Sequence, residues 1–247
     1  MMELLSVKQA AELLDIDDSR VRQLLRAGTL EGQQVGGRWL VDGHGARQRK
    51  ERGSTQGRPL SERNAWGLLA ALSGQRAPNL SDAERSRIAS RLRSMAAHKE
   101  PPVARLRQLV RVRAERRRYR VHSGLLPILL DDPDVVRGGV SAAARVGVGY
   151  LAPGRAEVYV RLDKVGKLEA AFGLARDNAK GNLLVRVAPA EVWPFLRADA
   201  APGKSADAPA AVVAADLLDS DEDRAETAAS ELWQRLIDDL QKRSNVG

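Results

Sequence analysis

The sequence predicts an α+β protein, in which a small N-terminal module is joined by a basic linker to a larger, helix-rich α+β domain. Three patterns predict this class. Residues 1–42 hold two short helical patterns followed by two short strands, and residues 62–118 have helical periodicity. From residue 119 to residue 247 short strands alternate with helices, and two further helices close the chain. Residues 43–61 between the first two segments are expected to be a flexible linker.

Composition excludes several classes of protein. The chain has 247 residues and no cysteine, which rules out disulfide scaffolds, zinc fingers, iron–sulfur proteins and thiol enzymes. Its three histidines, His44, His98 and His122, lack the spacing of metal ligands, so we expect neither a metal site nor a cofactor. No secretory signal and no apolar run long enough for a membrane span is evident. We therefore expect a cytoplasmic protein.

Charge is unevenly distributed along the chain. The net charge is +8, from 40 Lys and Arg against 32 Asp and Glu. Residues 61–122 carry +10 and residues 206–247 carry −6, while the other two segments carry +2 each. The basic middle suits a polyanion, and the acidic tail suits a basic protein surface. The alternative is that both are solvated helix faces.

The N-terminal segment begins with two short helices. Ser6 and Gln9 form a capping-box pattern, and the apolar residues from Val7 to Leu14 recur at helical spacing. Asp17 suits the N-cap of a second helix, which runs through Arg26 and stops at Gly28. Two short helices around a tight turn predict a helix-turn-helix.

The second helix is expected to present a polar face to solvent. This face comprises Ser19, Arg20, Arg22, Gln23 and Arg26. Arg pairs with guanine and Gln with adenine in the major groove, and spare Arg groups neutralise phosphates. Residues 31–41 then predict two strands around the Gly36-Gly37 turn, with Arg38 placed to reach a neighbouring groove or phosphate and Trp39 anchored in the core. For the polar face of the second helix, the alternative is an amphipathic helix that is merely solvated.

Segments 6–14, 19–30 and 35–41 together resemble the excisionase-type, MerR-like winged helix-turn-helix. The resemblance covers about a sixth of the chain and implies binding to double-stranded DNA. One departure concerns Asp15, Asp17 and Asp18, which stand where this family often has Gly, Ser or a basic residue. Carboxylates there favour the helix dipole but repel phosphate, so affinity for non-specific DNA should be weak.

The linker is rich in Gly, Gln and Arg. Its cations Arg47, Arg49 and Lys50 are candidates to lie along DNA or to enter a minor groove. A plain tether of the same composition would look similar.

The middle segment is expected to hold three helices. They lie at 64–74, from the capping box of Ser81 and Glu84 to about Met95, and after Pro101-Pro102. A dense run of arginines follows at 111–120, and Tyr119–His122 is expected to be a strand that enters the last domain. Those arginines suit a phosphate clamp, a solvated helix or an acidic partner, and the sequence leaves the three open.

In the last segment the pattern predicts strands at 157–161 and 182–187 and two closing helices at 209–218 and 222–240. The second closing helix has a broad apolar stripe, which is either core or a partner surface. Segments 119–122, 134–144, 181–187 and 210–220, followed by Arg224 and Leu232, resemble the C-terminal domain of AbiEi-type antitoxins. The resemblance implies a repressor of its own operon, encoded beside an AbiEii-type nucleotidyltransferase toxin.

No catalytic constellation is recognisable. A nucleotidyltransferase needs a Gly-Ser turn followed by paired aspartates. Ser123-Gly124 is followed only later by Asp131-Asp132, and the run 220–223 lacks the glycine turn, so both acidic pairs are expected to be caps and loop acids. We therefore expect a non-enzymatic, sequence-specific regulator: residues 1–42 bind an operator, and the remainder forms a homodimer or engages a toxin. The alternative is an excisionase-like or architectural DNA-binding protein without a toxin partner.

Overall fold

The computed structural model describes residues 4–14, 16–26, 30–51, 59–76, 79–97, 103–220 and 222–245. The chain divides into two compact units, Met1–Gly57 and Arg58–Gly247, which we call unit 1 and unit 2. Each unit has its own hydrophobic core.

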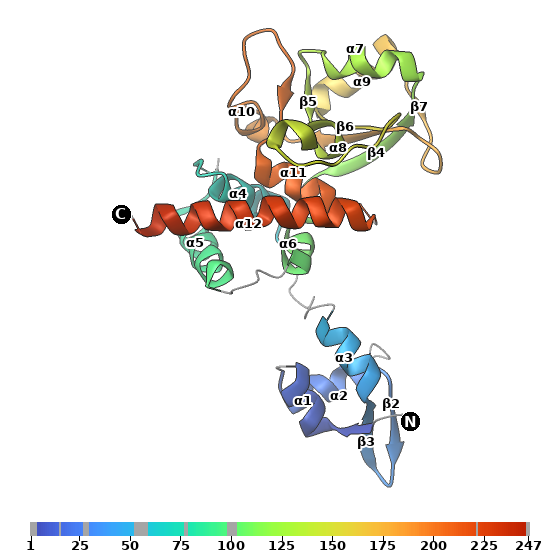
Figure 1. Ribbon diagram of the computed structural model, residues 1–247, viewed down its shortest axis with the longest axis vertical. Helices are drawn as coiled ribbons and strands as arrows, with labels where there is room; N and C mark the ends of the chain where they lie inside the picture. Colours follow the sequence, from blue (N-terminus) through green and yellow to red (C-terminus); the bar gives the residue numbers. More distant parts are fainter. Residues whose placement is uncertain are drawn as a thin grey trace. The chain divides into compact units, whose positions relative to one another are not determined.

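The described residues of unit 1 form three helices and a small antiparallel sheet (Figure 1). Its elements are β1 (Leu4–Ser6), α1 (Val7–Leu14), α2 (Asp18–Arg26), β2 (Gly32–Val35), β3 (Arg38–Asp42) and α3 (Gly43–Glu51). The strand order is β1-β3-β2, so the central strand β3 is paired on both sides. Buried residues of α1, α2 and α3 pack with Leu30 and Val41 to form the core. The predicted helix pair and the predicted two-stranded wing are both present.

The prediction of a flexible linker from residue 43 is wrong for residues 43–51, which form α3. Asp42 ends β3 and caps this helix, since its carboxylate accepts hydrogen bonds from the backbone N–H groups of His44 (3.3 Å) and Gly45 (2.8 Å). Ala46 is fully buried in the core of unit 1. A cap and one buried alanine therefore order a segment whose Gly and Arg content is typical of a tether. Residues 52–58 lie outside the described residues.

Unit 2 is built on a six-stranded mixed sheet. Its strands are β4 (Glu115–Arg120), β5 (Val135–Arg137), β6 (Ala156–Arg161), β7 (Ala175–Arg176), β8 (Leu183–Ala188) and β9 (Ala206–Asp207), in the order β7-β4-β8-β6-β5-β9. The pairs β6–β8 and β5–β9 are parallel, and the other pairs are antiparallel. Strand β4 starts four residues before the predicted Tyr119, so the arginine run lies within the sheet.

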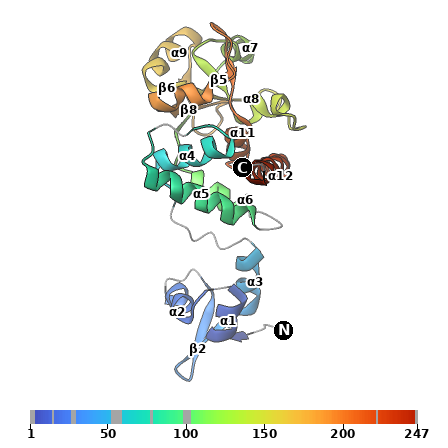
Figure 2. The ribbon, with the colours of Figure 1, turned by 90° about the vertical axis from the view of Figure 1, so that its left-hand side faces the viewer.

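One face of the sheet is covered by α7 (Leu126–Leu130) and α9 (Val165–Phe172) (Figures 1 and 2). Alternate residues of the central strands point to this side, including Val158 and Val160 of β6 and Val185 and Val187 of β8. This alternation is the period of two that a strand with differently packed faces requires.

The opposite face is covered by α8 (Gly139–Ala142) and α11 (Ala210–Leu217), with α4 (Glu62–Leu72), α5 (Asp82–Ala96), α6 (Val103–Val110), α10 (Trp193–Leu196) and α12 (Asp223–Asn245) completing the layer (Figure 1). Trp66 of α4 is buried in this core, edge-on to Tyr159 at 5.7 Å and to Phe195 at 6.4 Å between ring centroids. The aromatic rings join the helical layer to the sheet.

Two expectations about unit 2 are decided by this packing. The apolar stripe of α12 is core, because Leu232, Trp233 and Ile237 are all buried against the neighbouring helices. The helices of segment 62–118 also share this core with α11 and α12 rather than forming a segment of their own. The α+β class and the larger helix-rich second unit are as predicted.

Candidate nucleic-acid interface

Helices α1 and α2 of unit 1 are fixed by caps and by a small apolar core. Ser6 and Gln9 form the predicted capping box: the Ser6 N–H donates to Gln9 Oε1 (2.9 Å), and the Gln9 N–H donates to Ser6 Oγ (3.2 Å). The Asp17 carboxylate accepts a hydrogen bond from the Arg20 N–H at 2.8 Å, which caps α2. Val21, Leu24 and Leu25 face the core, so the remaining face of α2 is held outward.

The structure brings the predicted contact residues of α2 onto that outer face. Ser19, Arg22, Gln23 and Arg26 are exposed, and Arg20 is half-buried and hydrogen-bonded to Gln23. Arg22 lies 3.6 Å from Asp18 in an exposed ion pair, with 46% of each side chain accessible. A pair so exposed contributes little to stability, so the Arg22 guanidinium can exchange Asp18 for another acceptor at small cost.

The acidic residues at the start of α2 are engaged locally. Asp17 caps the helix and Asp18 pairs with Arg22, whereas Asp15 lies outside the described residues. Because both carboxylates have partners within unit 1, part of their negative charge is compensated there. The expected repulsion of phosphate is reduced by these contacts.

Strands β2 and β3 form a wing that projects from the same core. Gly36 and Gly37 have φ values of +57° and +77°, the left-handed conformations that a tight two-residue turn requires. Arg38 follows the turn and is exposed, while Trp39 is half-buried against the core as predicted. Trp39 thus anchors the strand that carries Arg38.

Helix α3 adds the predicted cations that follow the wing. Arg47 is exposed on this helix. Arg49 and Lys50 also belong to α3, but their side chains lie outside what the structure describes. The candidates after residue 42 therefore sit on an ordered helix.

In unit 2 the arginine run at 111–120 divides between a buried network and the surface. Arg113 is 1% exposed and its Nη2 lies 2.6 Å from Asp216 and 2.8 Å from Asp219. Along β4, Arg117 pairs with Glu115 (2.7 Å) and Arg120 pairs with Asp177 (2.9 Å). The run is therefore a turn and a strand, not a solvated helix.

The network around Arg113 links α11 to the sheet. Arg186 of β8 is 2% exposed and contacts Asp219 (2.8 Å) and Glu157 (3.3 Å). Its Nε lies 3.1 Å from Asp216 Oδ1, outside hydrogen-bond alignment. The Tyr159 hydroxyl donates to Asp216 at 2.6 Å, and burial raises the pKa of this phenol. Sequence reasoning missed this network, because its members are far apart in the chain and no local pattern connects them.

The pKa values of two carboxyl groups at the edge of the network, those of Glu157 and Asp219, are shifted in opposite directions. Burial raises the pKa of Glu157, and the nearby Arg186 only partly offsets it. Burial would also raise the pKa of Asp219, but Arg113, Arg186 and Arg116 together lower it below its usual value. Asp219 is thus held as the anion between guanidinium groups.

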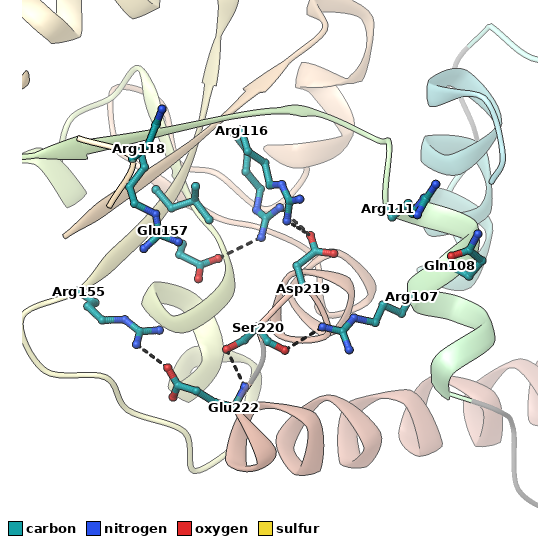
Figure 3. A pocket seen from close by; sticks show the side chains of 13 residues that line it. Arg107, Gln108, Arg111, Arg116, Arg118, Arg155, Glu157, Asp219, Ser220 and Glu222 are labelled. Carbon is teal, nitrogen blue, oxygen red and sulfur yellow. Dashed lines mark hydrogen bonds and ion pairs between the residues drawn. The ribbon is translucent and has the colours of Figure 1, made fainter. Parts of the chain in front are cut away.

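A pocket of about 780 Å³ opens beside this network (Figure 3). It lies between α6, strands β4, β6 and β8, and the turn from α11 to α12. Its lining is strongly polar and comprises Arg107, Gln108, Arg111, Arg116, Arg118, Arg155, Glu157, Asn178, Leu184, Arg186, Asp219, Ser220 and Glu222.

Among the acidic residues weighed for catalysis and the histidines weighed as metal ligands, Asp131, Asp132 and His122 have structural contacts. Asp131 lies 3.3 Å from Arg137, and Asp132 accepts a hydrogen bond from the Asp134 N–H at 2.7 Å. His122 accepts from the Gly124 N–H at 3.2 Å, while Asp221 and His98 lie outside the described residues. Across the part of the chain that is described, acidic and histidine side chains form no group of three that could hold a metal ion.

Comparison with known families agrees with this organisation. A helix-turn-helix domain matches residues 4–44, which span unit 1 from β1 to the start of α3. A family described as transcriptional regulator, AbiEi antitoxin, type IV toxin–antitoxin system matches residues 104–238, more than half of the chain. Searches for similar curated proteins and for similar solved structures found no match. Among the described residues, none of the helices has the length and apolar character to cross a membrane.

The second match covers the sheet of unit 2 and most of α12, and the first covers the helix pair and the wing. Both predicted resemblances are confirmed. The chain belongs to the family of AbiEi antitoxin transcriptional regulators, and it carries a helix-turn-helix DNA-binding domain ahead of the antitoxin domain.

Proposed function

We propose that unit 1 binds the operator of the protein's own operon by placing α2 in the major groove. The observation that carries this proposal is the exposed polar face of α2, held outward by a buried apolar face and set beside a two-stranded wing. A helix-turn-helix reads base edges with the exposed side chains of its second helix.

The candidate residues divide by chemistry. Arg22, Gln23 and Arg26 are the proposed base-reading side chains, because Arg and Gln can each form two hydrogen bonds with a purine. Ser19 and Arg20 lie at the start of α2, where hydroxyl and guanidinium groups suit phosphate oxygens. The remaining cations, Arg38 on the wing and Arg47, Arg49 and Lys50 on α3, are proposed to contact phosphates or the adjacent minor groove.

The test is a gel-shift titration of the full chain with DNA from upstream of its own gene. The double substitution Arg22→Ala plus Arg26→Ala should abolish specific retardation, since each lost bidentate pair costs about 1–3 kcal/mol. A matched control removes two exposed cations from α12, Arg224→Ala plus Lys242→Ala, and should bind as wild type does. Equal binding by wild type and the α2 variant would exclude α2 as the reading helix.

We further propose that unit 2 neutralises a nucleotidyltransferase-like toxin encoded beside this gene, and that it also forms the homodimer. The protein then acts by binding and not by catalysis, in keeping with a family described as regulators and antitoxins. The exposed acidic residues of α12, such as Glu226 and Asp238, are candidates for the toxin contact, because they suit a basic protein surface. A regulator that binds an operator works where the DNA is, so a cytoplasmic location is part of this proposal.

Two observations test the toxin assignment. The adjacent open reading frame should encode a nucleotidyltransferase-like protein, and the full chain should relieve the growth arrest that this protein causes on expression. A regulator that binds its operator but has no such neighbour would be the excisionase-like or architectural alternative.

Size-exclusion chromatography with light scattering measures whether the free chain is a dimer.

A further inference from the structure

The pocket of unit 2 carries more positive charge than its own carboxylates neutralise. Six arginines line it against three carboxylates. Two of these arginines already form ion pairs within the protein. Arg186 belongs to the buried network, and Arg155 pairs with Glu222 at 2.5 Å. Other lining arginines lack a close ion pair with any residue that the structure describes, and their charge determines which ligands the pocket can bind.

The uncommitted cations lie on two different walls. Arg111 follows α6 and Arg118 lies on β4, and both are exposed; among the described residues neither guanidinium has an ion pair or a hydrogen bond. Arg116 of β4 is 50% exposed and reaches Asp219 only at 3.9 Å. Figure 3 shows Arg111 on the α6 side and Arg116 and Arg118 along β4, so positive charge borders the pocket from separate directions.

Arg116 lies beside the buried network and contacts it only at long range. Asp219 accepts contacts from Arg113 and Arg186 at 2.8 Å each, so its charge is already shared between two guanidinium groups. The long contact to Arg116 therefore leaves most of that cation's charge available to a ligand. The buried network therefore borders a pocket whose rim is cationic.

The shape of the pocket selects among anions. A volume of about 780 Å³ is within the range of small-molecule sites. Guanidinium groups bind phosphate through paired, charge-assisted hydrogen bonds. Because these groups stand on separate walls, they suit a ligand with several anionic groups better than one small ion. A DNA duplex presents its phosphates on a convex surface, which fits this concave site poorly.

We propose that the pocket of unit 2 binds a small phosphorylated ligand of nucleotide size, with its phosphates held by Arg111, Arg116 and Arg118. The amide of Asn178 and the carboxylates of Glu157 and Glu222, which line the same pocket, offer hydrogen-bond partners for hydroxyl or amino groups of such a ligand. This site is separate from α2 and the wing, and it does not depend on operator binding by unit 1.

The experiment is isothermal titration calorimetry on the full chain at low ionic strength, with ATP, inorganic pyrophosphate and adenosine as probes. Wild type should bind ATP and pyrophosphate saturably and should not bind adenosine. The double variant Arg111→Gln plus Arg118→Gln should bind ATP at least about tenfold more weakly, which corresponds to roughly 1.4 kcal/mol. Both side chains are exposed and unpaired among the described residues, so this variant should melt at the wild-type temperature.

The matched control is Arg91→Gln plus Arg93→Gln, which removes two arginines of α5 that do not line the pocket. It should bind ATP as wild type does. The proposal is overturned if neither ATP nor pyrophosphate binds wild type saturably, if both double variants bind ATP equally, or if adenosine binds as tightly as ATP. A last result would also overturn it. If Arg111 and Arg118 are needed for binding duplex DNA of unrelated sequence, but not for binding ATP or pyrophosphate, the two arginines contact a DNA backbone.

Discussion

At the scale of single residues, Asp216 is the carboxylate on which the interior of unit 2 depends. Its side chain is fully buried and contacts Arg113 (2.6 Å), the Tyr159 hydroxyl (2.6 Å) and the Gly139 N–H (2.9 Å). Two buried guanidinium groups, those of Arg113 and Arg186, are balanced mainly by Asp216 and Asp219. Removing one carboxylate leaves positive charge buried without compensation.

The substitution Asp216→Asn should therefore destabilise unit 2 by about 3–5 kcal/mol, the cost of breaking a buried ion pair. Urea unfolding followed by tryptophan fluorescence measures this, because Trp66 and Trp233 are buried in the same core. The control is Asp163→Asn, whose carboxylate pairs with Arg161 at the surface and whose loss should leave the free energy of unfolding close to that of wild type. Equal losses from the two substitutions would contradict the assigned role of Asp216.

Glu157 should make the stability of unit 2 depend on pH with the opposite sign to an ordinary ion-paired carboxylate. Burial raises its pKa in the folded state, despite Arg186 and in part because Asp216 and Asp219 are near. Between its unfolded value of 4.5 and the raised folded value, the folded state binds more protons than the unfolded state. The stability that this group contributes is thus present below pH 4.5 and is lost as the pH rises.

Glu157→Gln removes that titration, so the free energy of unfolding should fall less between pH 4.5 and pH 7 in the variant than in wild type. Urea titrations of both proteins across this range measure the difference. The lowered pKa of Asp219 acts only as the pH falls below about 3.8, outside this window. The exposed substitution Glu226→Gln serves as the control and should keep the wild-type slope. An identical slope for Glu157→Gln would show that Glu157 is not buried as described.

At the scale of elements, the sequence predicts those whose signals are local. The capping box at Ser81 and Glu84 is present as predicted, with the Ser81 N–H donating to Glu84 at 2.9 Å. The Gly36-Gly37 turn likewise marks the wing. Short strands such as β7 and β9 have only two residues and exist because a neighbouring strand pairs with them. No periodicity can reveal a strand of that length.

The same contrast holds for the candidate site. The outward face of α2 follows from helical spacing, and the structure places its residues as expected. Of the arginines that line the pocket of unit 2, Arg111, Arg116 and Arg118 come from the arginine run that the sequence shows at 111–120, whereas Arg155 and Arg186 come from distant parts of the chain. The sheet order β4-β8-β6 places Arg186 of β8 and Arg155 before β6 beside that run, and no local pattern in the sequence reveals that order.

Helix α3 supplies a test at this scale, because a single cap starts it. Asp42→Ala removes the acceptor for the His44 and Gly45 N–H groups and should destabilise α3 by about 1 kcal/mol. Amide hydrogen exchange of the full chain should show roughly fivefold faster exchange in α3. Asp42→Asn retains an acceptor oxygen and should stay close to wild type. Unchanged exchange in the alanine variant would mean that packing of Ala46 alone holds the helix.

At the scale of the whole molecule, the net charges of the sequence segments do not match the charge that these segments expose. The net charge of residues 61–122 is +10, yet part of it is buried or paired, as with Arg113, Arg117 and Arg120. The exposed remainder includes the rim of the pocket. The acidic C-terminal segment contributes Asp216 and Asp219 to the interior of unit 2. Part of the charge asymmetry of the sequence is therefore cancelled within unit 2.

This arrangement predicts where the chain can be divided. The sequence suggested a domain starting at residue 119, whereas α4, α5 and α6 share a core with α11 and α12. A fragment of residues 119–247 lacks those helices and Arg113, so it should expose Trp233 and leave Asp216 without its closest cation. We expect it to bind a hydrophobic dye and to unfold without a cooperative transition. A fragment of residues 58–247 keeps the whole core and should unfold cooperatively in urea, as measured by tryptophan fluorescence. Cooperative unfolding of the shorter fragment would place the boundary at residue 119 and would make the three helices an appendage of unit 2.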